Sequence, residues 1–176
     1  MDQNLRDVQT AISCLLHAID DTQGTIRAYD MKANSLGVLL TLALGLSNIS
    51  LLQSPAFCTK NLLFLSLGLG LLALFTLGLV LRPVMNPVKK VNVGNYVPTK
   101  TYFVDSKSLT VEDSVDVHAR RTVQTDWVAE LTYEKIKLAS IRSYKHSCFT
   151  WAIVLSGATL VLIAVAVATQ VGGCNG

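Results

Sequence analysis

Three long stretches of the chain contain no lysine, arginine, aspartate or glutamate: residues 33–59, 61–81 and 146–176. Each holds an apolar core close to the roughly 20 residues that a helix needs to cross a bilayer. A hydrophobic fraction of 51%, with only 15% charged residues, is typical of an integral membrane protein. The sequence therefore predicts an all-α membrane protein with a cytoplasmic helical bundle and three transmembrane helices, at residues 36–52, 62–81 and 148–171.

The lysines and arginines predict how these spans are oriented. Eleven of the fifteen basic residues lie between the second and third spans. The positive-inside rule places that segment and the N-terminus in the cytoplasm, and the 53–60 loop and the C-terminus outside. Because topology accounts for the basic excess, the net charge of +3 does not indicate a nucleic-acid polymer as partner. The chain then divides into a cytoplasmic N-terminal helix (1–34), a transmembrane hairpin (35–81), a partly helical cytoplasmic segment (82–147), and the third transmembrane helix with a short outward tail (148–176).

The predicted topology also assigns each cysteine to one side of the membrane. Cys58 falls in the outward loop and Cys174 in the outward tail, whereas Cys14 is cytoplasmic and Cys148 begins the third span. If the outside is an oxidising bacterial periplasm, Cys58 and Cys174 are candidates for a disulfide. The alternative is two unrelated thiols near the membrane.

Two cytoplasmic segments have helical patterns that run toward spans. Residues 4–33 carry a heptad-like apolar stripe, and no proline separates them from the first span. Residues from about 115 to 145 are helical by pattern, and no glycine or proline separates them from the third span. Their apolar positions are Val123, Trp127, Leu131, Leu138 and Ile141. Only residues 91–97 and 101–104, on either side of Pro98, resemble strands.

Small residues recur at every fourth position in the first two spans. They are Gly37, Thr41 and Gly45 in the first span, and Ser66 and Gly70 in the second. Such faces let helix backbones approach closely in lipid, either within one subunit or between subunits. We expect the chain to form a homo-oligomer.

No set of residues predicts catalysis or a metal site. His17 lies near Cys14 and His146 near Cys148, but neither pair supplies the three or four ligands that zinc requires, and His118 has no such neighbour. No serine, cysteine or carboxylate pair stands in a recognisable catalytic context. We therefore expect a protein that is not an enzyme and that has no cofactor.

Ligand binding has more support, from basic and aromatic residues near the cytoplasmic ends of the spans. Arginines with aromatic side chains suit a nucleotide, whose phosphate they bind and whose base they stack on. The candidate ligand-binding residues are Arg27, Asp30, Lys32, Tyr102, Phe103, Arg120, Arg121, Arg142 and Lys145. The alternative is that the cations bind lipid headgroups and that Asp30 pairs with Arg142 or Lys145.

The order of these parts resembles the small transmembrane effectors of Pycsar, a bacterial anti-phage system. The resembling features are Asp30-Met31-Lys32-Ala33 before the first span, Arg82-Pro83 after the second, Thr101-Tyr102-Phe103-Val104-Asp105, Leu109-Thr110-Val111-Glu112-Asp113, and Ala129-Glu130-Leu131-Thr132-Tyr133 before the last. The resemblance implies a partner cyclase that makes a cyclic pyrimidine mononucleotide after infection. It also implies an effector that responds by impairing the bacterial inner membrane.

The resulting hypothesis is a multi-pass effector in the lipid bilayer, triggered by a cyclic mononucleotide. The ligand would bind between cytoplasmic helices and favour a different packing of the spans that these helices continue. One alternative is a constitutive membrane scaffold without a nucleotide ligand. Another is a channel subunit, although the predicted spans contain no charged residue of the kind that marks ion pathways.

Overall fold

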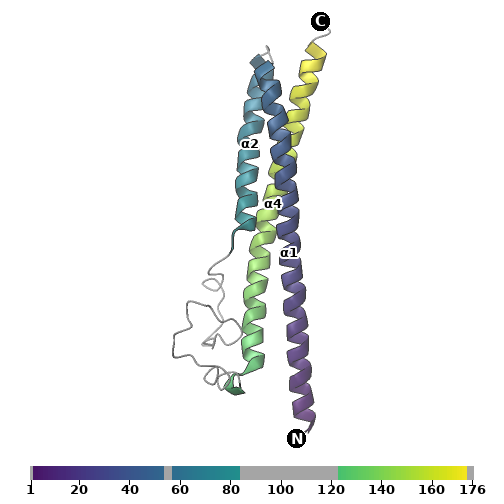
Figure 1. Ribbon diagram of the computed structural model, residues 1–176, viewed down its shortest axis with the longest axis vertical. Helices are drawn as coiled ribbons and strands as arrows, with labels where there is room; N and C mark the ends of the chain where they lie inside the picture. The colour runs from purple at the N-terminus through teal and green to yellow at the C-terminus, as the bar shows by residue number, and fades with distance from the viewer. Residues whose placement is uncertain (1, 54–56, 84–122, 174–176) are drawn as a thin grey trace. The chain divides into compact units, whose positions relative to one another are not determined.

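The computed structural model describes residues 2–53, 57–83 and 123–173, and within them the chain is almost entirely helical. Its three long helices are α1 (Asp2–Gln53), α2 (Phe57–Leu81) and α4 (Trp127–Gly173) (Figure 1). The predicted helical class is confirmed for this part of the chain. The segments at 91–97 and 101–104, which resemble strands in sequence, lie outside it.

Helix α1 runs unbroken for 52 residues. It therefore joins the N-terminal heptad segment to the predicted first span without interruption, as expected from the absence of proline. Residues seven apart on one face are buried or half-buried, and these are Ile19, Ile26, Ala33, Leu40 and Ser47. This spacing is typical of helices that pack side by side with a slight left-handed supercoil.

Helix α4 is also continuous from its polar N-terminal part into the predicted third span, but it begins later than the sequence predicted. The residue before it, Asp126, accepts hydrogen bonds at Oδ1 from the backbone N–H groups of Val128 (3.1 Å) and Ala129 (3.2 Å). Asp126 is thus an N-cap, which satisfies N–H groups that have no partner inside a helix. The prediction of a helix through residues 115–145 is therefore wrong at Thr125 and Asp126, which are not helical. Val123, which the sequence predicts among the apolar positions of this helix, is 86% exposed.

The chain forms two compact units. One contains residues 1–25 and 84–142, and the other contains residues 26–83 and 143–176. In the described part of the first unit, Ile19 and Leu131 are buried. Two carboxylates, Glu130 and Glu134, are buried as well, and the Lys137 ammonium lies 3.1 Å from Glu134 Oε1.

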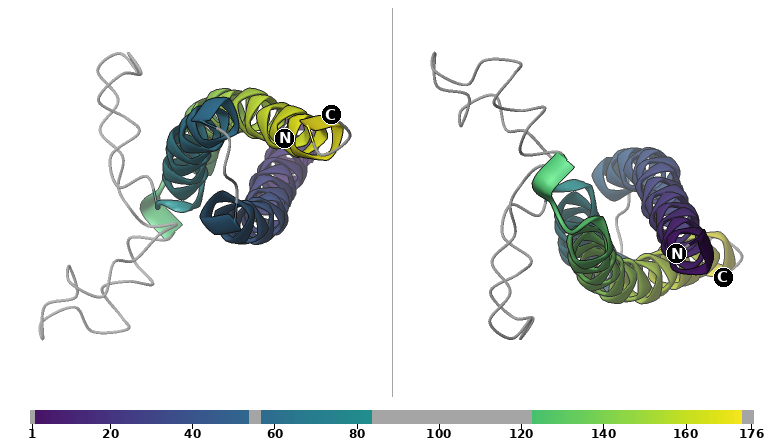
Figure 2. Two further views of the ribbon diagram at one scale, coloured as in Figure 1. Left: turned by 90° about the horizontal axis from the view of Figure 1, so that it is seen from above. Right: turned by 90° about the horizontal axis from the view of Figure 1, so that it is seen from below.

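In the second unit α1, α2 and α4 lie side by side (Figures 1 and 2). Helices α1 and α4 run in the same direction and α2 runs against them, since α2 follows α1 after a short connection. Two apolar clusters hold the three helices together. The first is built on Ala33, Leu77, Val80 and Ala152, and the second on Leu40, Leu44 and Ala73 with Leu155 and Ile163 of α4 against it.

Glycine in α2 allows one close approach between α1 and α2. A Cβ added at Gly70 would lie only 2.6 Å from Cδ2 of Leu44. The predicted small-residue face of the second span, with Ser66 also buried, therefore packs within one subunit. Gly45 of the first span, by contrast, faces open space.

Two of the helices contain segments long and apolar enough to cross a membrane. These are Lys60–Leu81 and a window within Trp127–Thr169, and only 33% and 22% of the two windows is buried within the chain. Such low burial is unlike the core helix of a soluble protein and suits side chains that face lipid. These two segments are therefore candidate membrane spans by their length and composition. The span predicted at 36–52 lies in α1, and its crossing of the membrane stays a prediction.

Candidate functional site

Side chains of α1 and α4 meet at the start of the predicted third span, in a group that we call the junction cluster: Tyr29, Asp30, Lys145, His146 and Phe149. The Lys145 ammonium donates a hydrogen bond to Oδ1 of Asp30 and forms an ion pair with it. The lysine side chain is only 6% exposed, whereas that of Asp30 is 37% exposed. The cation is therefore the buried member of the pair and depends on Asp30 for compensation.

The neighbouring residues of the same two helices make a second polar contact. The Tyr29 hydroxyl lies 2.9 Å from Nδ1 of His146 and is hydrogen-bonded to it. The Tyr29 ring also packs on two rings of α4, with centroids 5.8 Å from His146 and 5.7 Å from Phe149, both tilted. Tilted aromatic pairs at these distances are favourable beyond the area that they bury. Two adjacent residues of α1 thus bind two adjacent residues of α4.

The heptad spacing of α4 explains why a lysine lies inside this contact. Residues seven apart on its inner face are all buried or half-buried: Leu131, Leu138, Lys145, Ala152, Thr159 and Ala166. Lys145 is the one charged member of this series. A single polar residue at such a position fixes the register of paired helices at a cost in stability. The Asp30–Lys145 pair therefore specifies how α1 and α4 align where they enter the predicted spans.

The C-terminal end of α2, which Arg82 follows, lies near the junction cluster. The pKa of Tyr144 is raised, first by a hydrogen bond with the Cys148 side chain, then by the charge of Cys148 and by burial, while Arg82 acts in the opposite direction. Leu77 and Val80 of α2 also pack in the apolar cluster against which Tyr29 and Phe149 lie. All three helices of this unit therefore come together around the junction cluster.

The structure brings together only two of the residues predicted to bind a ligand. Asp30 and Lys145 bind one another, which confirms one of the pairings left open by the sequence. Arg27 and Lys32 are exposed beside them on α1, and Arg142 is exposed in the other unit. Tyr102, Phe103, Arg120 and Arg121 lie outside the described residues. So does Cys174, and its predicted disulfide with Cys58 stays a prediction, whereas Cys14 and Cys148 are free thiols.

Sequence reasoning missed the aromatic half of the junction cluster. The sequence places Tyr29 only within the apolar stripe of residues 4–33 and His146 only in an incomplete set of metal ligands, and it gives no sign of Phe149. The available signal was the register of the two heptad series, which pairs Ala33 with Ala152 in one apolar cluster. Tyr29 and Phe149 lie one turn before Ala33 and Ala152, respectively, so the small alanines bring their aromatic neighbours into contact.

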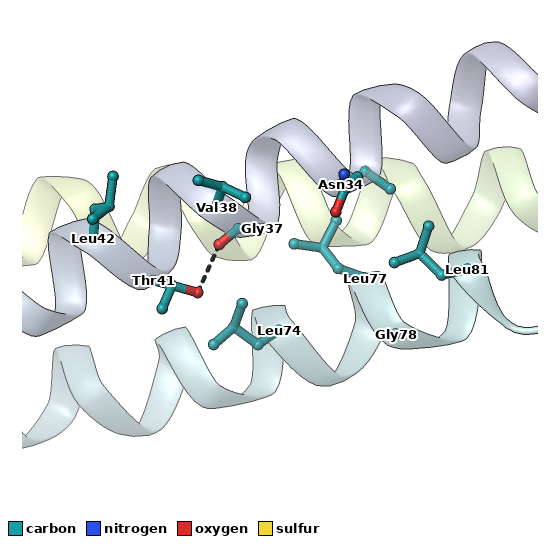
Figure 3. Close-up of a pocket in the computed structure, with 10 residues that line it drawn as sticks. Asn34, Gly37, Val38, Thr41, Leu42, Leu74, Leu77, Gly78 and Leu81 are labelled. Atoms are coloured by element: carbon teal, nitrogen blue, oxygen red, sulfur yellow. Dashed lines mark hydrogen bonds between the residues drawn. The ribbon is translucent and has the colours of Figure 1, made fainter.

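A groove of about 430 Å³ lies between α1 and α2 (Figure 3). Its walls are apolar except for Asn34 and Thr41, and Thr41 Oγ1 donates to the Gly37 carbonyl at 2.8 Å. Gly37 and Gly78 contribute no side chains and so leave the groove open. Gly37 and Thr41 of the predicted small-residue face of the first span therefore line this groove instead of packing tightly on α2.

These features define a class of protein: a helical protein in which two long helices, paired at a junction, continue into apolar segments of membrane-spanning length. The family model of the Pycsar effector protein domain matches residues 14–172, and the chain belongs to this family. The resemblance seen in the sequence is thereby confirmed, and the protein is an anti-phage effector of the membrane. No curated protein and no solved structure matches the chain.

Proposed function

We propose that the protein is triggered by a cyclic mononucleotide, of the cyclic pyrimidine class, and then impairs the integrity of the bacterial inner membrane. Membership of the Pycsar effector family supports the defence role. The observation that carries the mechanism is the junction cluster, because it links α1 and α4 at the level where both helices enter apolar segments. No catalytic step is part of this proposal.

The junction cluster would hold the resting packing of the spans. Lys145 is buried and has its counter-charge on a different helix, so separating α1 from α4 leaves a buried cation without compensation. A nucleotide can shift such an equilibrium only if it binds the active packing more tightly than the resting one. Its phosphate is an anion that could replace Asp30 as the partner of Lys145 or bind the exposed cations Arg27 and Lys32.

Three further elements complete the proposal. Residues 36–52 of α1 form a third span, so that the N-terminus and residues 82–147 are cytoplasmic and the C-terminus faces outward. The protein acts in the inner membrane as a homo-oligomer, for which the open groove at Gly37 and Gly78 supports close approach of another helix. A partner cyclase supplies the nucleotide.

Calorimetric titration of the purified protein with cyclic mono- and dinucleotides tests the trigger. We expect heat of binding with 3′,5′-cyclic CMP or cyclic UMP and none with linear CMP or UMP, which are matched controls. The same nucleotides should release dye from liposomes that contain the protein. Dye release that is equally fast without nucleotide would favour a constitutive channel, and neither binding nor release would favour a scaffold.

A further inference from the structure

The inner face of α4 carries two hydroxyls near the middle of the predicted third span. Ser156 and Thr159 lie one turn apart, between the buried alanines Ala152 and Ala166. Ser156 is only 2% exposed and Thr159 is fully buried. The lipid-facing side of the same helix is different, since Val154 and Val161 are 56% and 62% exposed. These two hydroxyls of the span thus point toward the other helices.

One of these hydroxyls lacks a hydrogen bond. Buried serines and threonines of the spans generally bond to a carbonyl of their own helix, as Thr159 does to Leu155 (2.8 Å) and Ser66 does to Leu63 (2.8 Å). Among the described residues, Ser156 Oγ is the only buried side-chain oxygen or nitrogen without a partner. Lipid offers no hydrogen bond in compensation, so this group is unfavourable where it stands.

The other two helices add hydroxyls to the same interior. Ser66 of α2 is fully buried, and Ser47 of α1 is buried and bonds to the Ala43 carbonyl. The predicted spans contain no charged side chain. Their interior therefore offers water a few hydroxyl partners and offers ions no charge by which to select between them.

We propose that Ser156 and Thr159 line the route by which water and small hydrated ions cross the bilayer when the effector is triggered. Water entering between the helices supplies the missing partner of Ser156, so that hydration favours the open packing over the closed one. The route passes potassium and chloride alike, because it carries no ring of charge. This inference rests on the proposed membrane-impairing function and names the residues that perform it.

Thiol accessibility tests this assignment in liposomes triggered with cyclic CMP and cyclic UMP. Ser156→Cys and Thr159→Cys are made in a chain whose four native cysteines are serine, with Val154→Cys and Val161→Cys as lipid-facing controls. A water-soluble methanethiosulfonate should label the first pair about tenfold faster with nucleotide than without it, because the thiolate that reacts requires water. The controls should label slowly in both conditions. Leak with all four positions equally unreactive would overturn the assignment and leave the proposed function standing.

A second variant works in the native chain. Ser156→Ala removes the unsatisfied hydroxyl, which stabilises the closed packing and should slow nucleotide-dependent leak roughly threefold. Val154→Ala, which shortens a side chain on the lipid side, should leave the leak rate unchanged. Equal leak for Ser156→Ala and the wild type would indicate that the hydroxyl serves ordinary helix packing and would overturn the inference. Absence of leak in the wild type with every nucleotide would overturn the proposed function and this inference together.

Discussion

Lys145 and Asp30 form an ion pair whose members differ in burial, with 6% of the lysine side chain and 37% of the aspartate side chain exposed. The two residues therefore depend on one another unequally. Asp30 can be hydrated when its partner is removed, but Lys145 cannot be hydrated without a change in packing. This asymmetry makes the cost of breaking the pair depend on which residue is replaced.

The first prediction follows from that asymmetry. Asp30→Asn should lower the free energy of unfolding by about 1–3 kcal/mol, because a buried cation loses its counter-charge while the partly exposed site limits the loss. Lys145→Met should change stability by less than about 1 kcal/mol, since it replaces the buried charge with an apolar chain of similar length. Thermal unfolding in detergent measures both, with the exposed Arg27→Met as control. A larger loss for Lys145→Met than for Asp30→Asn would contradict the prediction.

The contributions of the Tyr29 ring and of its hydroxyl to stability should be measurable separately. Tyr29→Phe removes the hydrogen bond to His146 but keeps both ring contacts, and should cost about 0.5–1.5 kcal/mol. Tyr29→Ala also removes the ring contacts with His146 and Phe149, and should cost about 2–4 kcal/mol. The same unfolding measurement compares them. Equal losses would show that the rings contribute nothing.

Two glycines of α2 provide a matched pair. Gly70→Val places a branched side chain where a Cβ already meets Leu44, and should cost about 1–3 kcal/mol through overpacking. Gly68→Val makes the same change where nothing lies within 4 Å, and should be nearly neutral. Adding Leu44→Ala should restore part of the loss caused by Gly70→Val. Similar unfolding temperatures for the two valine variants would refute the close approach of α1 and α2.

Charge at Arg142 should matter for triggering rather than for insertion. Arg142→Glu should abolish nucleotide-dependent toxicity in cells that express the cyclase, because it removes an exposed cation three residues before Lys145. Membrane insertion should be unchanged, since the substitution lies outside the apolar segment. Lys135→Glu, also exposed on α4, is the control. Unchanged toxicity at matched protein levels would exclude a role for Arg142 in binding or transmission.

Topology is tested by fusions at two points. An alkaline phosphatase, active only in the periplasm, should be active after Gly176 and inactive near Lys107. The eleven basic residues between the second and third predicted spans are the physical reason, since positive segments stay in the cytoplasm. The reverse pattern would overturn the orientation.

The long helices could be predicted from the sequence because their signals are local. A heptad-like stripe in residues 4–33, a helical pattern before residue 145 and the absence of proline predict that α1 and α4 each continue into an apolar segment, and both do. The beginning of α4 could not be predicted in the same way. No glycine or proline marks it, and Asp126 ends the preceding helical pattern only because its carboxylate binds the next N–H groups.

The junction cluster was predictable only in part. Charge complementarity suggested a partner for Asp30, but choosing Lys145 over Arg142 depends on which of them lies on the inner face of α4. The missing partner of Ser156 has no signal in sequence at all. Whether a hydroxyl in a helix bonds to its own backbone is decided by its rotamer, which the packing of neighbouring helices sets.

The unbroken course of α1 restricts how a signal can travel through it. A helix of 52 residues is roughly 78 Å long, and this one has no proline at which to bend. Kinks form at proline, at glycine and serine pairs or at π-bulges, and the part of α1 in the second unit is α-helical throughout, from Ile26 to Gln53. While this part stays helical, a stimulus at the junction cluster can reach the apolar end as twist about the helix axis, as tilt, or as sliding along it. Twist changes which side chains face the neighbouring helices at every level of this part at once, including those of the apolar segment.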